Sequence, residues 1–257
     1  MEQMPPRIFS NERRNAVRRR ARALFGQGAS PSQYILLDMI EDIFERLNFL
    51  RHEPRKVLAI GDRTGELAYN FEEFSANEIL VETVQPEDGF NEEAPYPEGG
   101  YDLIASLATL DTVNDLPGAL IHMRQALAPG GLAIATFVGG ASLQGLRHAM
   151  IAADGDRPAS RMHPLIDHRS CPQLLQRAGW QDPVVDTRRL DVRYSSFDLL
   201  VSDLRHQAMT CQLASRAPSL TAEQRRIAAE TFTDGADRVS VSFDIITLTG
   251  RRPSPRF

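Results

Sequence analysis

The stretch LAIGDRTGEL, residues 58–67, has the residue types and spacing of a loop that holds a nucleotide-like cofactor. Its apolar start is typical of a buried strand, and Gly61 and Gly65 follow it. Glycines at such a strand–loop–helix junction adopt positive φ without strain and let backbone N–H groups approach an anionic ligand. Asp62 and Arg63 stand between them, where such loops usually keep small residues. The stretch is therefore either a working cofactor loop or the remnant of one, and its G-x-x-x-G pattern alone does not decide which.

Other side chains suited to chemistry are spread along the chain. Asp111 follows a predicted strand and suits a general base or a polar substrate contact, although an acid at a strand end more often caps a helix or lies on the surface. His163 and His168 bracket the sequence PLID, and as loop histidines they are expected to be solvated. Cys171 and Cys211 are interpreted as reduced thiols of a cytosolic protein. Neither the cysteines nor the six histidines have metal-ligand spacing, so no metal site is predicted.

Alternating strands and helices must position these residues. Because the strands are apolar on both faces, the pattern predicts an α/β fold with a mostly parallel sheet and helices on both sides. Ser30 and Gln33 have the spacing of a capping box, with Pro31 at the first helical position, before an apolar stripe that ends at Leu50. The predicted strands are 56–60, 78–84, 101–107, 132–138, one or two strands in 184–194, and 239–250. The other predicted helices are 66–74, 115–127, 142–153, 171–178 and 196–234.

The segment between the second and third predicted strands is too short for a normal parallel crossover. Residues 85–100 contain three prolines and three glycines. A crossover that includes its own strand needs a helix, a strand of about five residues and a further connection. We therefore predict that one edge strand and the helix before it are missing, and that a coil connects the two strands instead.

The charge of the chain is divided between a basic arm and an acidic body. Residues 7–22 hold seven arginines against one acid and predict a short helix that ends at Gly26 and Gly28, whereas residues 41–98 carry a net charge of −10. The arm either packs on the body of its own molecule or engages an acidic protein or an anionic membrane surface. Nucleic acid is disfavoured because the acidic body would repel phosphate. The candidate partner-binding residues are Arg13, Arg14, Arg18, Arg19, Arg20 and Arg22.

Four stretches resemble a known family. Residues 101–137, in which NDLPGAL is followed by LAPGGL, are similar to the fourth strand, the next helix and the fifth strand of class I S-adenosylmethionine-dependent methyltransferases. GGASLQGLRHA (139–149) and VSFDIITLTG (241–250) resemble one subgroup. That subgroup joins malonyl-acyl-carrier O-methyltransferases to the methyltransferase-like assembly factors of respiratory complex I, whose mitochondrial member is described as an arginine hydroxylase. The opening IFSNERRNAVRRRARA (8–23) resembles the assembly-factor branch. The resemblance implies a Rossmann-like sheet with an antiparallel C-terminal strand.

The cofactor loop departs from the family pattern [D/E]-x-G-x-G-x-G. Ala59 stands at the acid position, and Arg63 takes the middle glycine position between Gly61 and Gly65. An arginine there is expected to be strained at positive φ and to fill ligand space. It should also repel a sulfonium cation unless Asp62 pairs with it.

Two further positions bear on the same site. Glu82 stands where the family places a carboxylate that binds both ribose hydroxyls, or it is one more acid on an acidic surface. Asp111 and Thr112 replace an aromatic HW pair of the family. The candidate residues of a degenerate cofactor site are Gly61, Asp62, Arg63, Gly65 and Glu82.

These departures favour a methyltransferase-like protein with a damaged S-adenosylmethionine site, acting without a cofactor as a non-catalytic assembly or binding factor. The alternative is an active methyltransferase with a remodelled loop, whose cofactor would be S-adenosylmethionine. The expected partner is a protein such as a respiratory-complex subunit. Because the arginine-rich segment lies inside the family resemblance, we expect a bacterial cytoplasmic protein without a removable transit peptide, with the inner-membrane surface as a second contact of the arm. The expected organisation is a basic arm (1–28), a methyltransferase-like domain (29–250) and a disordered tail (251–257).

Overall fold

A six-stranded sheet forms the centre of the computed structural model, which describes residues 7–25, 33–74 and 78–254. The strand order is β2-β1-β3-β4-β6-β5. The first four strands in this order run parallel, and β6 runs antiparallel to both of its neighbours. The predicted mostly parallel sheet with an antiparallel C-terminal strand is therefore confirmed. The strands are β1 (Lys56–Ile60), β2 (Leu80–Val84), β3 (Tyr101–Leu107), β4 (Leu127–Gly139), β5 (Gln181–Tyr194) and β6 (Val239–Arg251).

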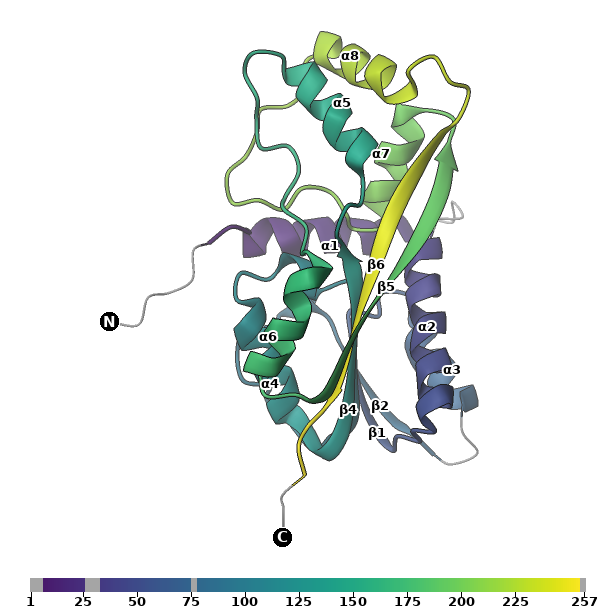
Figure 1. The fold of residues 1–257 in the computed structure, drawn as a ribbon, viewed down its shortest axis with the longest axis vertical. Helices are drawn as coiled ribbons and strands as arrows, with labels where there is room; N and C mark the ends of the chain where they lie inside the picture. The colour runs from purple at the N-terminus through teal and green to yellow at the C-terminus, as the bar shows by residue number, and fades with distance from the viewer. Residues whose placement is uncertain (1–6, 26–32, 75–77, 255–257) are drawn as a thin grey trace, which may run out of the picture.

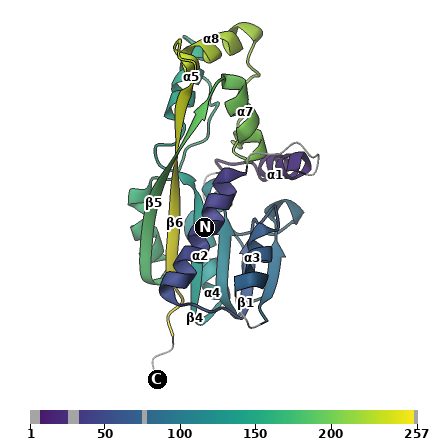
Figure 2. The same ribbon diagram turned by 90° about the vertical axis from the view of Figure 1, so that its right-hand side faces the viewer.

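Helices cover both faces of this sheet (Figures 1 and 2). On one face α2 and α3 bury their apolar stripes against β1, β3 and β4, and on the other face α4 and α6 pack on the same strands. In Figure 1, α5, α7 and α8 gather beyond the sheet, where the long β5–β6 pair extends past the other strands. The helices are α1 (Asn11–Phe25), α2 (Tyr34–Leu50), α3 (Glu66–Phe74), α4 (Leu116–Ala126), α5 (Gln144–Asp154), α6 (Cys171–Arg177), α7 (Phe197–His206) and α8 (Ala222–Thr233).

The segment between β2 and β3 contains no strand and no α-helix. Residues 85–100, all of which the structure describes, hold a single 3-10 turn at Pro86–Asp88 and otherwise irregular backbone. The prediction of a missing strand is confirmed, and β2 is consequently the edge of the sheet.

Two helices differ at their boundaries from the predicted ranges. The predicted capping residues Ser30 and Pro31 lie outside the described residues, and α2 begins at Tyr34 after Gln33, whose side chain makes no capping bond. The helical stretch 196–234 is two helices, α7 and α8, joined by residues 207–221. The break follows from the composition of this connection, since Pro218 and the polar residues around it do not continue a helix.

Residues 251–254, predicted to belong to a disordered tail, are among the residues that the structure describes. Arg251 is the last residue of β6. The Arg252 guanidinium donates hydrogen bonds to the carbonyl oxygens of Gln125 and Leu127, at 2.7 and 2.6 Å. Residues 251–254 therefore pack on the domain. None of the helices within the described residues combines the length and the apolar character needed to cross a membrane.

Candidate functional site

The basic helix α1 lies across the carboxyl ends of the parallel strands and packs against α7 (Figures 1 and 2). Arg14 is 5% exposed and binds Glu92, which is fully buried in the coil that replaces the missing strand. Its guanidinium donates to both Glu92 carboxylate oxygens at 3.0 and 2.6 Å, to the Thr109 carbonyl oxygen at 2.7 Å and to Thr112 Oγ1 at 3.2 Å. Burial by itself would lower the pKa of Arg14, but the Glu92 carboxylate outweighs this and raises that pKa. The arm thus packs on its own acidic body through a buried ion pair.

Arg18, one helical turn further along α1, is more deeply buried than Arg14 and makes fewer hydrogen bonds through its guanidinium group. It is 1% exposed, and Nη2 donates to the Ala108 carbonyl oxygen at 2.5 Å. Its Nε and Nη1 atoms have no hydrogen-bond partner among the described residues. Burial, followed by repulsion from Arg14, lowers the pKa of Arg18 to about 10, so the side chain keeps its positive charge at neutral pH.

The other arginines of the arm lie nearer to solvent. Arg22 pairs with Asp88 at 2.7 Å with both side chains about half exposed, and Arg19 donates to the Glu87 carbonyl oxygen at 3.2 Å. Arg20 is exposed and donates to Thr210 Oγ1 at 3.2 Å. Arg13 is partly buried and donates to the carbonyl oxygens of Cys211, Leu213 and Ser215. The arm therefore divides into a buried pair of arginines and an exposed basic surface.

In the glycine-rich loop, positive φ values occur only at glycines, which adopt them without strain. Gly61 and Gly65 have φ values of +82° and +78°, whereas Arg63 is not among the residues with positive φ. The expectation that Arg63 is strained is therefore wrong. The Asp62 carboxylate turns back into the loop and accepts hydrogen bonds from the backbone N–H groups of Gly65 at 3.1 Å and Ala68 at 3.0 Å. These two amides lie at the N-terminus of α3, where backbone N–H groups lack partners within the helix. The Asp62 side chain therefore caps α3.

Arg63 is buried rather than turned to solvent, and it lines a small space together with Leu36 of α2, Ala108 and Gln207. It is 8% exposed, and its Nη1 atom has no hydrogen-bond partner in the part of the chain that the structure describes. Burial lowers its pKa, against the attraction of Glu87, Asp111 and Asp62 in that order. No hydrogen bond joins the Arg63 side chain to Asp62 among the described residues, so Asp62 does not neutralise Arg63 through a direct contact.

Glu82 lies in the middle of β2 and is hydrogen-bonded to a residue of β3. Its carboxylate accepts a hydrogen bond from Tyr101 Oη at 2.5 Å. The position just past the end of β2 belongs to Gln85, whose Nε2 donates to the Asp62 carbonyl oxygen at 2.6 Å. An open pocket of about 570 Å³ lies between the loop and this strand end, and Gln85 lines it whereas Glu82 is not among its lining residues. Sequence reasoning missed Gln85, although its place directly after the strand was the available signal.

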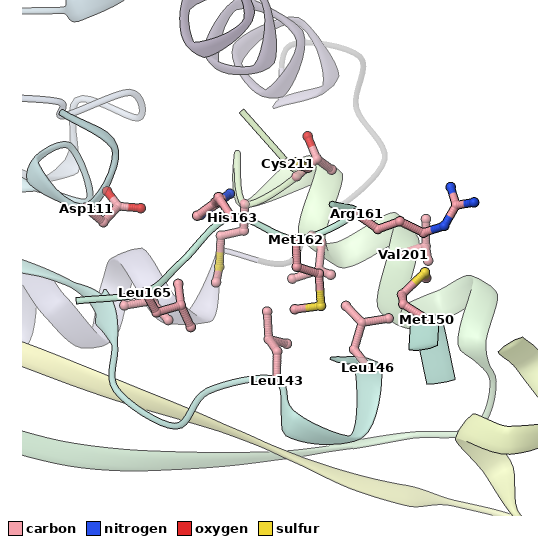
Figure 3. Close-up of a pocket in the computed structure, with 14 residues that line it drawn as sticks. Asp111, Leu143, Leu146, Met150, Arg161, Met162, His163, Leu165, Val201 and Cys211 are labelled. Carbon is pink, nitrogen blue, oxygen red and sulfur yellow. The ribbon is translucent and has the colours of Figure 1, made fainter. Parts of the chain in front are cut away.

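A second cavity lies on the other side of the loop, between the end of the sheet, α5 and α7 (Figure 3). Asp111 and His163 lie on the side of it away from Arg161 and Met150. His163, expected to be a solvated loop residue, is buried at 7% exposure against the ring of Phe9. His168 is half exposed beside Asp167, in agreement with the expectation of a solvated residue. No group of three or more His, Cys, Asp or Glu side chains suited to a metal ion occurs within the described ranges.

Comparison with known proteins finds methyltransferases in sequence and in structure. Residues 33–184 match a family model described as a methyltransferase domain. The chain is 32% identical over 174 residues to malonyl-[acyl-carrier protein] O-methyltransferase 1 of Coxiella burnetii, covering 63% of this chain and 60% of that protein. It is 32% identical over 134 residues to the mitochondrial arginine-hydroxylase NDUFAF5 of Homo sapiens, covering 51% of this chain and 38% of that protein. These matches span less than two thirds of either relative.

Solved structures support the same fold at low sequence identity. The [4+2]-cyclase SpnF superposes with a TM-score of 0.53 at 15% identity, covering 98% of this chain and 99% of the other. A putative methyltransferase from Bacillus halodurans gives a TM-score of 0.51 at 11% identity, covering 82% of this chain and 99% of the other. Likeness at this level of identity concerns the arrangement of strands and helices alone.

Proposed function

Because the chain belongs to the methyltransferase-domain family, we propose that it keeps the fold of that family without its methyl transfer and acts as a non-catalytic binding or assembly factor. Fold alone does not fix activity, since sites are lost or replaced on stable scaffolds. One solved structure with a similar fold is named a [4+2]-cyclase, so proteins of this fold are not all named methyltransferases.

The observation that carries this proposal is the occupation of the glycine-rich loop by its own side chains. S-adenosylmethionine ends in a carboxylate, and the amides at the start of α3 that could bind an anion include those of Gly65 and Ala68. Both already donate to Asp62, whose negative charge also disfavours a second carboxylate at the same place. In addition, a Cβ on Gly61 would lie 2.4 Å from the Leu107 carbonyl oxygen, so this glycine is packed against the chain rather than open to a ligand.

The charges around the loop also fit the cofactor poorly. The guanidinium groups of Arg18 and Arg63 are both buried and interact electrostatically with each other, and each lowers the affinity of this region for a sulfonium cation. On the adenosyl side, the pocket is open and the strand that would wall it is missing. We therefore assign no step of a methyl-transfer reaction to these residues.

A titration with the cofactor tests this proposal. A ligand present at 100 times its Kd stabilises a protein by about 2.7 kcal/mol, which a thermal scan resolves easily. We expect neither S-adenosylmethionine nor S-adenosylhomocysteine, at millimolar concentration, to raise the Tm or to give heat in a calorimetric titration. Micromolar binding of both ligands would overturn the proposal. Binding of S-adenosylhomocysteine alone would mean that the positive charge of S-adenosylmethionine, rather than its shape, prevents binding.

The partner-binding part of the proposal rests on the exposed face of α1. The resemblance to assembly factors of respiratory complex I supports a protein partner, and one sequence relative is named a mitochondrial arginine hydroxylase. Arg19, Arg20 and Arg22 remain at the surface after Arg14 and Arg18 have been used inside the molecule. We propose that this basic surface contacts an acidic region of a protein such as a respiratory-complex subunit, with an anionic membrane surface as the competing contact.

Reversal of charge on this surface provides a test of the contact. We expect the double variant Arg19→Glu, Arg20→Glu to lose about tenfold or more in affinity for an acidic protein captured by the wild type, and the wild-type contact to weaken as salt rises. The Tm should change little because both side chains are exposed. The control is Arg238→Glu, an exposed arginine outside α1. Equal losses in the two proteins, or binding only to anionic vesicles, would contradict the proposed protein contact.

A further inference from the structure

The cavity between the sheet, α5 and α7 has no part in the function proposed above, yet it has the features of a small-molecule site. Its volume is about 190 Å³, and its walls are mainly leucine, methionine and valine side chains. Leu143 and Leu146 enter from the start of α5, Met162 comes from the loop that follows, and Val201 comes from α7 (Figure 3). Pockets that are largely apolar with a few convergent polar groups are the usual form of ligand sites.

Two polar side chains at one end of the cavity have atoms without partners. Oδ1 of Asp111 and Nδ1 of His163 are both buried and make no hydrogen bond among the described residues. In Figure 3 the Asp111 carboxylate points toward His163 across the end of the cavity. Buried polar atoms are nearly always hydrogen-bonded in folded proteins, so this pair is suited to a partner that the chain does not supply.

The charges around this pair define the group that would satisfy it. Burial lowers the pKa of His163, so the imidazole is neutral at pH 7 and Nδ1 can carry a proton for donation. A carboxylate such as that of Asp111 accepts hydrogen bonds and does not donate them. A hydroxyl group matches both, because it donates through its hydrogen and accepts through its oxygen.

Charged ligands fit this end less well than a hydroxyl does. The guanidinium groups of Arg18 and Arg63 lie within electrostatic reach of Asp111 and already offset its charge, so a second cation gains little. An anion would face Asp111 itself, and either ion would lose its hydration against apolar walls. The ligand is therefore neutral.

The volume sets the size of the apolar part. An apolar cavity of about 150 Å³ in another protein holds one benzene molecule. A cavity of about 190 Å³ accepts a ring of that size with a short substituent. We propose that this cavity binds a compact, neutral, apolar molecule with one hydroxyl group, and that the hydroxyl lies between Asp111 and His163.

A matched pair of probes tests the proposal on the full chain. Calorimetric titration should show that 4-ethylphenol binds about tenfold or more tightly than ethylbenzene, which has the same apolar body without the hydroxyl. In the wild-type protein, 4-ethylphenol should shift the ¹⁵N resonance of the His163 imidazole, whereas ethylbenzene should not. No binding of 4-ethylphenol, or equal binding of the two probes, would overturn the proposal.

Two variants separate the polar end from the apolar walls. Asp111→Ala should reduce the preference for 4-ethylphenol to about twofold or less while ethylbenzene binds as before. Leu146→Trp fills the cavity from α5 and should abolish the binding of both probes. A full preference for the phenol in Asp111→Ala would overturn the assigned position of the hydroxyl. If either variant fails to fold, the His163 resonance in the wild type still decides the question. These outcomes do not depend on whether S-adenosylmethionine binds.

Discussion

Replacing Glu92 with alanine is expected to lower the free energy of unfolding by about 3–5 kcal/mol, because it leaves the Arg14 guanidinium buried without its carboxylate. Glu92 is fully buried and accepts two of the four hydrogen bonds that Arg14 donates. The remaining partners, Thr109 and Thr112, are neutral and cannot balance the charge. Urea unfolding followed by circular dichroism measures the change, with the slope of the transition compared between variants.

Two further variants identify the cause of that loss. The double variant Arg14→Met, Glu92→Leu should be closer in stability to the wild type than Glu92→Ala, because removing both charges leaves no buried ion. Glu223→Ala removes one partner of an exposed ion pair with Arg226 and should leave the stability almost unchanged. A loss below about 1 kcal/mol for Glu92→Ala would contradict a buried ion pair between α1 and the coil before β3.

The same pair gives the protein a defined sensitivity to acid. Burial by itself would raise the pKa of Glu92, but the charge and hydrogen bonds of Arg14 outweigh it, and the net pKa is lowered from 4.5. A carboxylate with a lowered pKa stabilises the fold above its unfolded pKa, and this contribution is lost as pH falls through the folded pKa. Unfolding free energies measured from pH 7 down to pH 3 should therefore fall more steeply in the wild type than in Glu92→Gln, which has no group to titrate at that position.

Docking of α1 depends on this pair, which links the stability of the arm to the proposed function. Arg14 is on α1, and α1 lies across the carboxyl ends of the strands (Figure 1). Hydrogen exchange should consequently increase across Asn11–Phe25 in Glu92→Ala before it increases in the central strands.

The sheet was predictable because its signals are local. Apolar strands alternate with helices along the chain, and this pattern requires a parallel sheet with helices on both faces. The missing strand was predictable as well, because residues 85–100 are too few and too rich in proline and glycine for a helix and a strand. The broken helix at 207–221 was missed because the flanking segments α7 and α8 have ordinary helical composition.

The site was less predictable because its interactions join segments that are distant in sequence. The charge count showed a basic arm and an acidic body, but it could not show that Arg14 finds Glu92 in particular. Nothing in the sequence distinguishes Glu92 from the other acids around it. His163 was taken as a solvated residue because it lies in a loop, and the packing of Phe9 that buries it comes from the other end of the chain.

The loop shows why a family pattern was an incomplete guide to conformation. Arginine at a glycine position predicted strain, yet Gly61 and Gly65 take both positive φ values and leave Arg63 in an ordinary region. What the pattern indicated correctly is that the Arg63 side chain needs space, and the structure provides that space beside Leu36 and Ala108.

Replacing Gly61 with alanine is expected to destabilise the protein by about 2–5 kcal/mol, even without any ligand. The new Cβ would lie 2.4 Å from both the Leu107 carbonyl oxygen and Thr109 Cγ2, and alanine would also be strained at a φ of +82°. Gly65→Ala is the matched control: its φ is +78°, but nothing lies within 4 Å of the added Cβ. It should therefore cost only the conformational strain of about 1–2 kcal/mol.

The comparison of these two variants by urea unfolding distinguishes two reasons for a glycine in this loop. If Gly61 serves the close approach of a cofactor, its replacement should affect ligand binding and cost no more stability than Gly65→Ala. If it serves the contact between the loop and the end of β3, Gly61→Ala should be the less stable protein by at least about 1 kcal/mol. Equal losses of stability in the two variants would contradict the packing role of Gly61 and would support a loop that binds a cofactor. We expect the unequal result, because the space above Gly61 is already filled by Leu107 and Thr109 of the chain itself.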